Sequence, residues 1–149
     1  MSFIDEILGN YALWIALCAW FVAQVLKIFT ELLRKKQLNL RIIMSSGGMP
    51  SSHSSFVTAV TTVIGLTDGF DSPLFALGAI VSLIVMYDAS GVRRAAGNQA
   101  KVINDILASI ENSGVVLDKK LKEMLGHTPL EVAAGGILGI VIALILHYQ

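Results

Sequence analysis

The chain is poor in cysteine and in charge, and each shortage narrows its class. Cys18 is the single cysteine among 149 residues, which excludes an internal disulfide. Charged residues make up only 15% of the chain against 54% hydrophobic residues, and the mean hydropathy is +0.70, too apolar for a soluble fold of this size. A basic N-terminal start is also missing, since the chain opens with Asp5 and Glu6, so we expect no cleavable signal. We expect one domain, residues 1–149, that is an integral membrane protein.

Four apolar runs predict transmembrane helices. They cover approximately residues 11–33, 54–67, 73–92 and 129–148. Between the third and fourth runs, apolar residues recur at helical spacing, which predicts amphipathic helices over about 98–112 and 115–125 that lie on the membrane surface. The expected fold class is therefore all-α: an integral membrane helical bundle of about four transmembrane helices, with amphipathic helices on the cytoplasmic side.

Basic residues are absent from three regions, and this absence predicts the orientation. All eleven lysines and arginines lie between Lys27 and Lys122, and none lies in the N-terminal tail, the turn at 67–73 or the C-terminal end. An even number of spans places these three regions on one side of the membrane. By the positive-inside rule, we expect a protein of the cell inner membrane with both termini outside and its basic face in the cytoplasm.

The most polar interruption of the chain runs from residue 45 to 55, Ser-Ser-Gly-Gly-Met-Pro-Ser-Ser-His-Ser-Ser. Two glycines allow a sharp turn, and Pro50 followed by serines is typical of a helix start. Backbone amides, hydroxyls and His53 would converge there, which favours an anion site. The alternative interpretation is an ordinary capping loop between two hydrophobic segments.

The predicted topology brings further charged residues to the same face as this loop. They are Lys27, Arg34, Arg41, Asp88, Arg93, Arg94, His127 and Glu131. Arginines and a lysine neutralise a phosphate, and two histidines supply a nucleophile or base and an acid. The alternatives are structural: Lys27 snorkels, Asp88 pairs with a nearby arginine, and Glu131 closes a capping box with Thr128.

Motifs around these residues resemble a known superfamily, the type-2 phosphatidic acid phosphatases, which also contains the vanadium haloperoxidases. Residues 50–53, Pro-Ser-Ser-His, resemble its Pro-Ser-Gly-His motif. Lys27 and Arg34, with Lys35 where a proline belongs, resemble its Lys-x6-Arg-Pro motif, and residues 127–131 resemble its closing His-x3-Asp with a glutamate in last place. Over nearly the whole chain, the match is closer to the divergent branch of small bacterial and plant membrane proteins. The stretches that carry this closer match are Gly-Met-Pro-Ser-Ser-His at 48–53, Asp-Ala-Ser-Gly-Val-Arg-Arg at 88–94 and Leu-Gly-His-Thr-Pro-Leu-Glu at 125–131.

The resemblance implies a metal-independent phosphatase that hydrolyses a phosphomonoester of a membrane lipid through a phosphohistidine. It makes His127 the nucleophile, Glu131 the group that orients its ring, and His53 the acid that protonates the leaving group. The implied phosphate-binding residues are Lys27, Arg34, Ser51, Ser52 and one of Arg93 or Arg94, with Asp88 and Gly48 in support. The family pattern has its arginine a few residues before the histidine, whereas more than thirty residues separate them here, so the chain must fold back.

Three functions stay open at this point. The first is hydrolysis of a lipid phosphate such as phosphatidic acid, phosphatidylglycerophosphate or a polyprenyl phosphate. The second is a non-catalytic protein that binds or moves anionic lipids, and the third is a zinc hydrolase using His53, His127 and Glu131, although their spacing matches no known zinc motif. We expect the lipid bilayer as partner, no cofactor and no nucleic acid. A homo-oligomer is open, since Gly135 and Gly139 permit close helix approach within or between copies.

Overall fold

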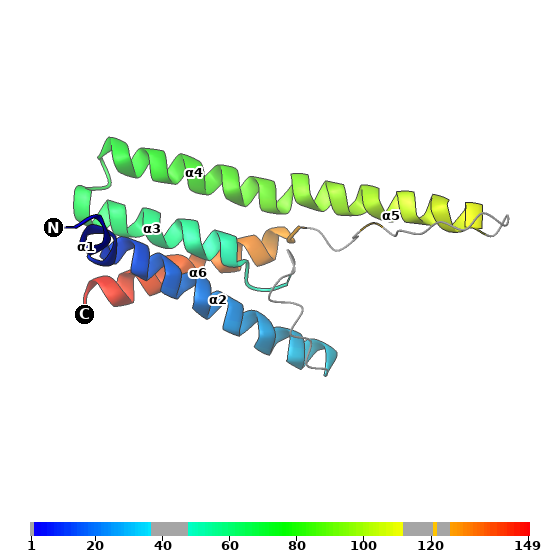
Figure 1. The fold of residues 1–149 in the computed structure, drawn as a ribbon, viewed down its shortest axis with the longest axis horizontal. Coiled ribbons are helices and arrows are strands. Elements are labelled where there is room, and N and C mark those ends of the chain that lie inside the picture. Colours follow the sequence, from blue (N-terminus) through cyan, green and yellow to red (C-terminus); the bar gives the residue numbers. More distant parts are fainter. Residues whose placement is uncertain (1, 37–47, 112–120, 122–125) are drawn as a thin grey trace.

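The computed structural model describes residues 2–36, 48–111, 121 and 126–149, and every element in that part of the chain is a helix. The helices are α1 (Phe3–Leu8), α2 (Tyr11–Lys35), α3 (Ser52–Asp68), α4 (Pro73–Ser90), α5 (Val92–Glu111) and α6 (Pro129–His147). Both termini lie at the end of the bundle that also holds the α3–α4 turn (Figure 1). The prediction of an all-helical membrane bundle is confirmed.

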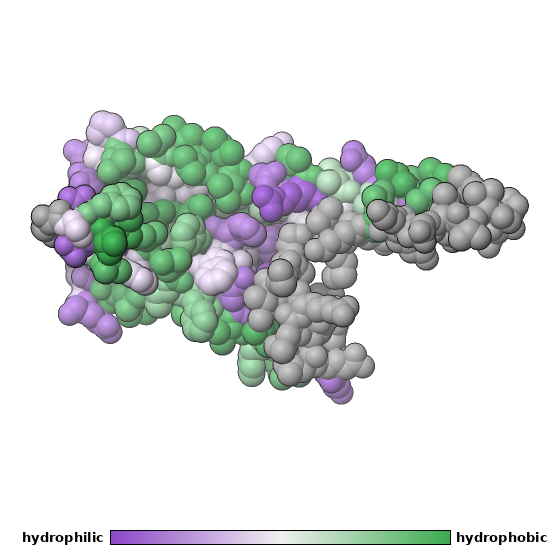
Figure 2. Space-filling view, viewed as in Figure 1, coloured by the Kyte–Doolittle hydropathy of each residue, from purple (hydrophilic) through white to green (hydrophobic). Residues whose placement is uncertain are grey.

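Three helical stretches of the described residues are long and apolar enough to cross a membrane. They are Tyr11–Leu33, Pro73–Ser109 and Pro129–His147. Apolar surface covers the side of the bundle, while polar residues gather near the termini and again near the α4–α5 junction (Figure 2). This banding is what a bilayer requires of a protein that spans it. The cytoplasmic orientation of the basic face stays a prediction.

Helix α3 lies at the centre of the bundle, and most of its buried residues are serine, threonine or small residues. It has 17 residues and packs against α2, α4 and α6. Its hydroxyls bond to neighbouring helices: Ser55 Oγ donates to the Ala19 carbonyl at 3.1 Å, and Thr58 Oγ1 donates to the Gly136 carbonyl at 2.9 Å. Such bonds join transmembrane helices that hydrophobic burial alone does not hold together in lipid.

The contact between α3 and α6 depends on glycine. A Cβ atom at Gly135 would collide with the Ser51 carbonyl, and one at Gly139 would collide with the Ser55 carbonyl. The two backbones therefore approach more closely than side chains would allow. The sequence left open whether these glycines pack within one chain or between copies, and the structure places them against α3 of the same chain.

Helix α5 differs from the predicted amphipathic helix at 98–112. Its placement on the membrane surface stays a prediction. It begins at Val92, directly after Gly91, and continues in roughly the direction of α4 to extend past the bundle (Figure 1). The reason is that helical hydrogen bonding crosses the junction: the Gly91 amide donates to Tyr87 at 2.8 Å, and the Ala95 amide donates to Gly91 at 2.9 Å.

The predicted helix at 115–125 lies outside the described residues except for Leu121. The backbone N–H of Leu121 donates to Asn104 Oδ1, and its carbonyl accepts from Asn104 Nδ2, both at 2.8 Å. This point of the chain therefore lies against α5. Helix α1 had not been predicted; it forms because Ser2 and Asp5 make a capping box.

Candidate functional site

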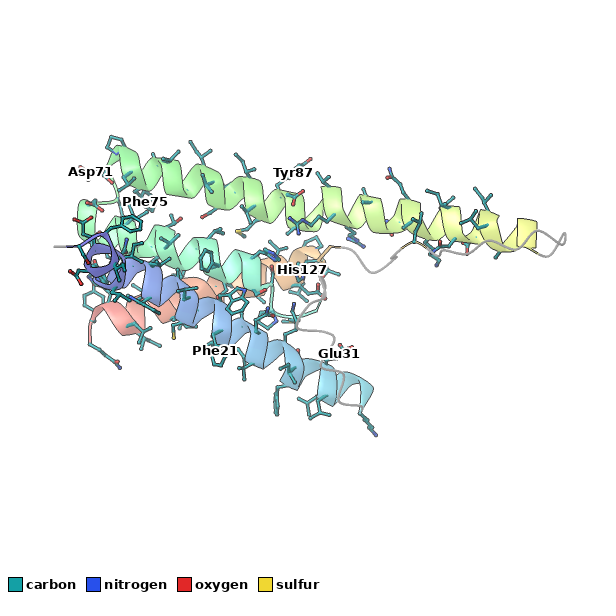
Figure 3. The ribbon with its side chains drawn as sticks, in the orientation of Figure 1. Phe21, Glu31, Asp71, Phe75, Tyr87 and His127 are labelled. Atoms are coloured by element: carbon teal, nitrogen blue, oxygen red, sulfur yellow. The ribbon has the colours of Figure 1, made fainter. Side chains whose placement is uncertain are left out.

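The candidate site lies at the end of the bundle away from the termini. Helices α3 and α6 both begin there, α4 passes into α5 there, and the last third of α2 reaches the same level. His127 lies at this end and Asp71 at the opposite one (Figure 3). Two helix starts next to each other place several amide donors in one region, because first-turn amides have no partner within their helix.

The segment before α6 rests on the α4–α5 junction. The His127 amide donates to the Ala89 carbonyl at 2.8 Å. Gly126 has φ +87°, and a Cβ there would collide with the backbone of Arg93 and Arg94. Only glycine adopts this conformation readily at such close approach. The chain therefore folds back, and the arginine and histidine motifs meet despite the long stretch between them.

Glu131 holds the ring of His127 from one turn along α6. Its Oε2 lies 3.2 Å from His127 Nδ1 and also accepts the Thr128 amide at 3.0 Å. A carboxylate only accepts hydrogen bonds, so Nδ1 carries the proton. Glu131 is thus both the capping-box residue and the group that orients the imidazole, and the two interpretations of its role are compatible.

The second ring nitrogen of His127, Nε2, is buried and has no hydrogen-bond partner among the described residues. The whole residue is 2% exposed. Buried polar atoms are normally satisfied, so an orphaned one in a ring held by a carboxylate is a candidate functional atom. Burial lowers the pKa of His127 below its ordinary value and outweighs the Glu131 hydrogen bond, which raises that pKa. The ring is therefore neutral at pH 7, with a free lone pair on Nε2.

His53 brings a second imidazole to the same place. Its ring centroid lies 6.4 Å from that of His127, and the two rings meet edge to face. His53 stands in the first turn of α3, after Ser51, whose side chain accepts the Ser54 amide as N-cap. The Ser51 amide donates to the Glu131 carbonyl at 3.0 Å, which ties the start of α3 to α6. The fold therefore brings His53 and His127 close together in space, as the sequence predicted.

The loop before α3 turns at Gly48, where φ is +98°. Ser51 and Ser52 are both buried directly after it. The amides of Ser52 and His53 lie in the first turn, where an anion is favoured by the helix dipole. Residues 45–47 of this motif, together with Arg41, lie outside the described residues.

A buried lysine lies near the histidine pair. Lys27 is 2% exposed and lies within electrostatic range of Glu131 and of both histidines. A lysine at that depth in a membrane helix is costly unless it serves an anionic partner, so simple snorkelling does not account for it. Arg34 belongs to α2, but its side chain lies outside the described part of the chain.

The structure distinguishes the two arginines. Arg93 Nε donates to Asp88 Oδ2 at 2.7 Å, and both side chains join His53 in lining a cavity of about 310 Å³. Arg94 instead contributes its backbone to the close contact with Gly126. Arg93 is therefore the arginine that faces His53, and Asp88 orients it.

Two site features were missed by sequence reasoning. The Ala89 carbonyl anchors His127, and Gly126 lets the chain approach α5. The glycine immediately before His127 was a usable signal; no signal marks Ala89, since a backbone carbonyl is the same in every residue. Among the described residues, no three His, Cys, Asp or Glu side chains form a group able to hold a metal ion.

Comparison with known proteins identifies the family of the chain. A family model described as the Divergent PAP2 family matches residues 8–142. The chain is also similar to the uncharacterized membrane protein YuiD of Bacillus subtilis (strain 168), with 43% identity over 154 aligned positions that cover 96% of this chain and 98% of that protein. No solved structure matches the chain. A match spanning all of the site residues and most of the helices shows that this membrane protein belongs to the divergent PAP2 family.

Proposed function

We propose that the protein is a phosphatase that hydrolyses a phosphomonoester of a membrane lipid, with His127 as nucleophile. The observation that carries the proposal is the state of that ring: Nδ1 is held by Glu131 at 3.2 Å while Nε2 is buried without a hydrogen-bond partner among the described residues. A neutral imidazole with one nitrogen held and the other free is the form that attacks phosphorus. Family membership supports the phosphatase class.

In the first step, the lone pair of His127 Nε2 attacks the phosphorus, and the bond from phosphorus to the alkoxide oxygen of the lipid breaks. His53, in its protonated form, gives its proton to the departing oxygen, so a lipid alcohol leaves. The positive charge that develops on the ring of His127 is stabilised by Glu131. The product is a phosphohistidine and a neutral His53.

In the second step, water attacks the phosphohistidine. His53, now neutral, takes a proton from the water as the bond between phosphorus and Nε2 breaks. Inorganic phosphate leaves, and His127 regains its lone pair. The 6.4 Å between the two ring centroids lets both imidazoles reach one phosphoryl group.

The phosphoryl oxygens bind to Lys27, to Arg93 and to the amides at the start of α3, all of which are donors. Ser51 and Ser52 shape that helix start, and Arg34 stays a predicted further ligand. His53 and Arg93 line one cavity together, and both side chains are exposed, so a phosphate can approach the site from that cavity.

The test uses purified protein in detergent with phosphatidic acid, phosphatidylglycerophosphate and a polyprenyl phosphate, and it measures inorganic phosphate. We expect release from at least one lipid, inhibition by vanadate and persistence in excess chelator. Saturable binding of these lipids with no release would instead favour the non-catalytic lipid-binding function. Loss of release in chelator would favour the metal hydrolase.

Glu131→Gln tests the orienting role through the pH profile. Burial already lowers the pKa of His127, and the Glu131 carboxylate opposes that by raising it. Removing the negative charge therefore lowers this pKa further, so the acid limb of kcat/KM moves to lower pH while the rate at pH 7 falls by roughly 10²-fold or more. Glutamine still closes a capping box, so the fold is kept. An acid limb that stays in place or moves to higher pH contradicts the orienting role.

Arg93→Ala and Arg94→Ala form a matched pair on adjacent residues. We expect Arg93→Ala to lower kcat/KM by roughly 10²- to 10³-fold, because it removes a charged donor to the phosphoryl group. Arg94→Ala should change it by less than roughly threefold, as for a surface substitution. The measurement is phosphate release under identical detergent conditions. Equal losses in the two variants would contradict the role of Arg93 as a donor to the phosphoryl group.

A further inference from the structure

A second cavity meets the site at His53, and its lining is apolar. It has a volume of about 370 Å³, and we call it the apolar groove. Its lining residues are Leu17, Trp20, His53, Phe56, Val57 and Val85. His53 lines both this groove and the cavity of Asp88 and Arg93, so a ligand at the charged cavity has the groove directly beside it.

The groove extends from the site along the candidate membrane span of α2, which covers residues 11–33. Helix α2 approaches the site from lower residue numbers, and Leu17 lies ten residues before Lys27, a distance of ~15 Å along a helix. Helix α3 runs away from the site, and the Ser82 hydroxyl of α4 donates to the carbonyl of Val57 in α3 at 3.1 Å. This bond places α4 beside the part of α3 that lines the groove. A depth of ~15 Å is about half of the ~30 Å hydrocarbon core, the depth of one leaflet.

We propose that the apolar groove binds the hydrocarbon chain of the phosphomonoester substrate and that Leu17 marks its deep end. This inference rests on the proposed function for the identity of the headgroup. Helices α2 and α4 both pack on α3, and residues of all three helices line the groove. Its volume is about two and a half times the ~150 Å³ of a cavity that holds benzene, so it fits one slender chain.

The groove therefore sets a preference for chain length. Extending an alkyl phosphate fills more of the groove until the chain reaches Leu17, and further carbons then gain nothing. Each buried methylene raises kcat/KM by roughly fourfold for substrates that are monomeric in water. Substrates with the shortest chains bury few methylenes in the groove and depend mainly on the headgroup contacts.

The test compares Leu17→Trp with Leu144→Trp across alkyl phosphates from methyl to decyl, measuring phosphate release. Leu17 and Leu144 are matched, being 37% and 38% exposed, but Leu144 lies on α6 away from the groove. We expect Leu17→Trp to keep wild-type kcat/KM for short chains and to lose the gain from longer ones, while Leu144→Trp follows the wild type. Val85→Trp, nearer the site, should stop the gain at a shorter chain. Identical chain-length profiles for Leu17→Trp and Leu144→Trp overturn the inference.

A binding measurement separates this inference from the proposed hydrolysis. Trp14 and Trp20 are the two tryptophans of the chain, so Trp14→Phe leaves Trp20 as the single tryptophan, which is excited selectively over the three tyrosines. An alkylphosphonate brominated along its chain should quench Trp20 saturably, and the brominated alcohol of equal length should not. Quenching without turnover would retain the groove and reject the phosphatase. Turnover without quenching, or equal quenching by the alcohol as expected of an ordinary bilayer lipid, would reject the groove.

Discussion

Replacing His127 with alanine is expected to lower phosphate release from a lipid phosphomonoester by at least roughly 10⁴-fold. The variant lacks Nε2, the buried nitrogen without a hydrogen-bond partner among the described residues, so no phosphohistidine forms. The remaining donors still bind the phosphoryl group. We therefore expect lipid binding to survive while turnover disappears, and binding measured by equilibrium dialysis beside phosphate release tests both parts.

His147→Ala is the matched control for that experiment. His147 ends α6 at the other end of the bundle, where its ring centroid lies 6.4 Å from that of Tyr11. Its loss should leave phosphate release near the wild-type rate. Because His127 is buried, its alanine variant is checked for its unfolding temperature, and His127→Asn provides a second variant that keeps a donor near Glu131. Turnover within tenfold of wild type in a folded His127 variant would remove it from the role of nucleophile.

Replacing Gly135 with alanine is expected to destabilise the bundle by about 1–3 kcal/mol, because the added methyl group collides with the Ser51 carbonyl. The collision involves backbone, which no rotamer change relieves. The Ser51 amide bonds to the Glu131 carbonyl across the same contact, so α6 cannot move outward without disturbing the site. The expected readout is a fall in the temperature of unfolding in detergent, together with reduced phosphate release.

Gly136→Ala is the control on the next residue of the same helix. A Cβ there lies 3.3 Å from the terminal methyl group of Met86, a flexible side chain that moves aside. We expect less than about 1 kcal/mol of change in the free energy of unfolding. Gly139→Ala, which meets the Ser55 carbonyl, should behave like Gly135→Ala. If Gly135→Ala and Gly136→Ala unfold at the same temperature, the close α3–α6 contact does not contribute as the structure indicates.

Several local features could be read directly from the sequence. The spacing of His127 and Glu131 places them one helical turn apart, and Thr128 followed by proline and Glu131 predicts the capped start of α6. Apolar runs of sufficient length predicted the membrane class. These predictions rest on residues within a few positions of one another, where the geometry of the helix alone decides which side chains meet.

The amphipathic pattern did not reveal how α5 is placed. Periodicity shows which face of a helix is apolar, but it does not show whether the helix bends at its start. The hydrogen bond from the Ala95 amide to Gly91 keeps α5 in line with α4, although a glycine at that point is as compatible with a break. The end of the predicted helix at 98–112 was close to that of α5, whereas its start was missed.

What the sequence determined by itself was the class of the protein, the long helices and the local pairs at helix starts, because each depends on composition or on spacing along one helix. The tertiary structure alone decided that Arg93 rather than Arg94 faces His53, that the glycines of α6 pack on α3 of the same chain, and that Gly126 closes the distance between distant motifs. These are contacts between helices far apart in the chain. They are made largely by backbone atoms and small residues, which leave little trace in a pattern of side chains.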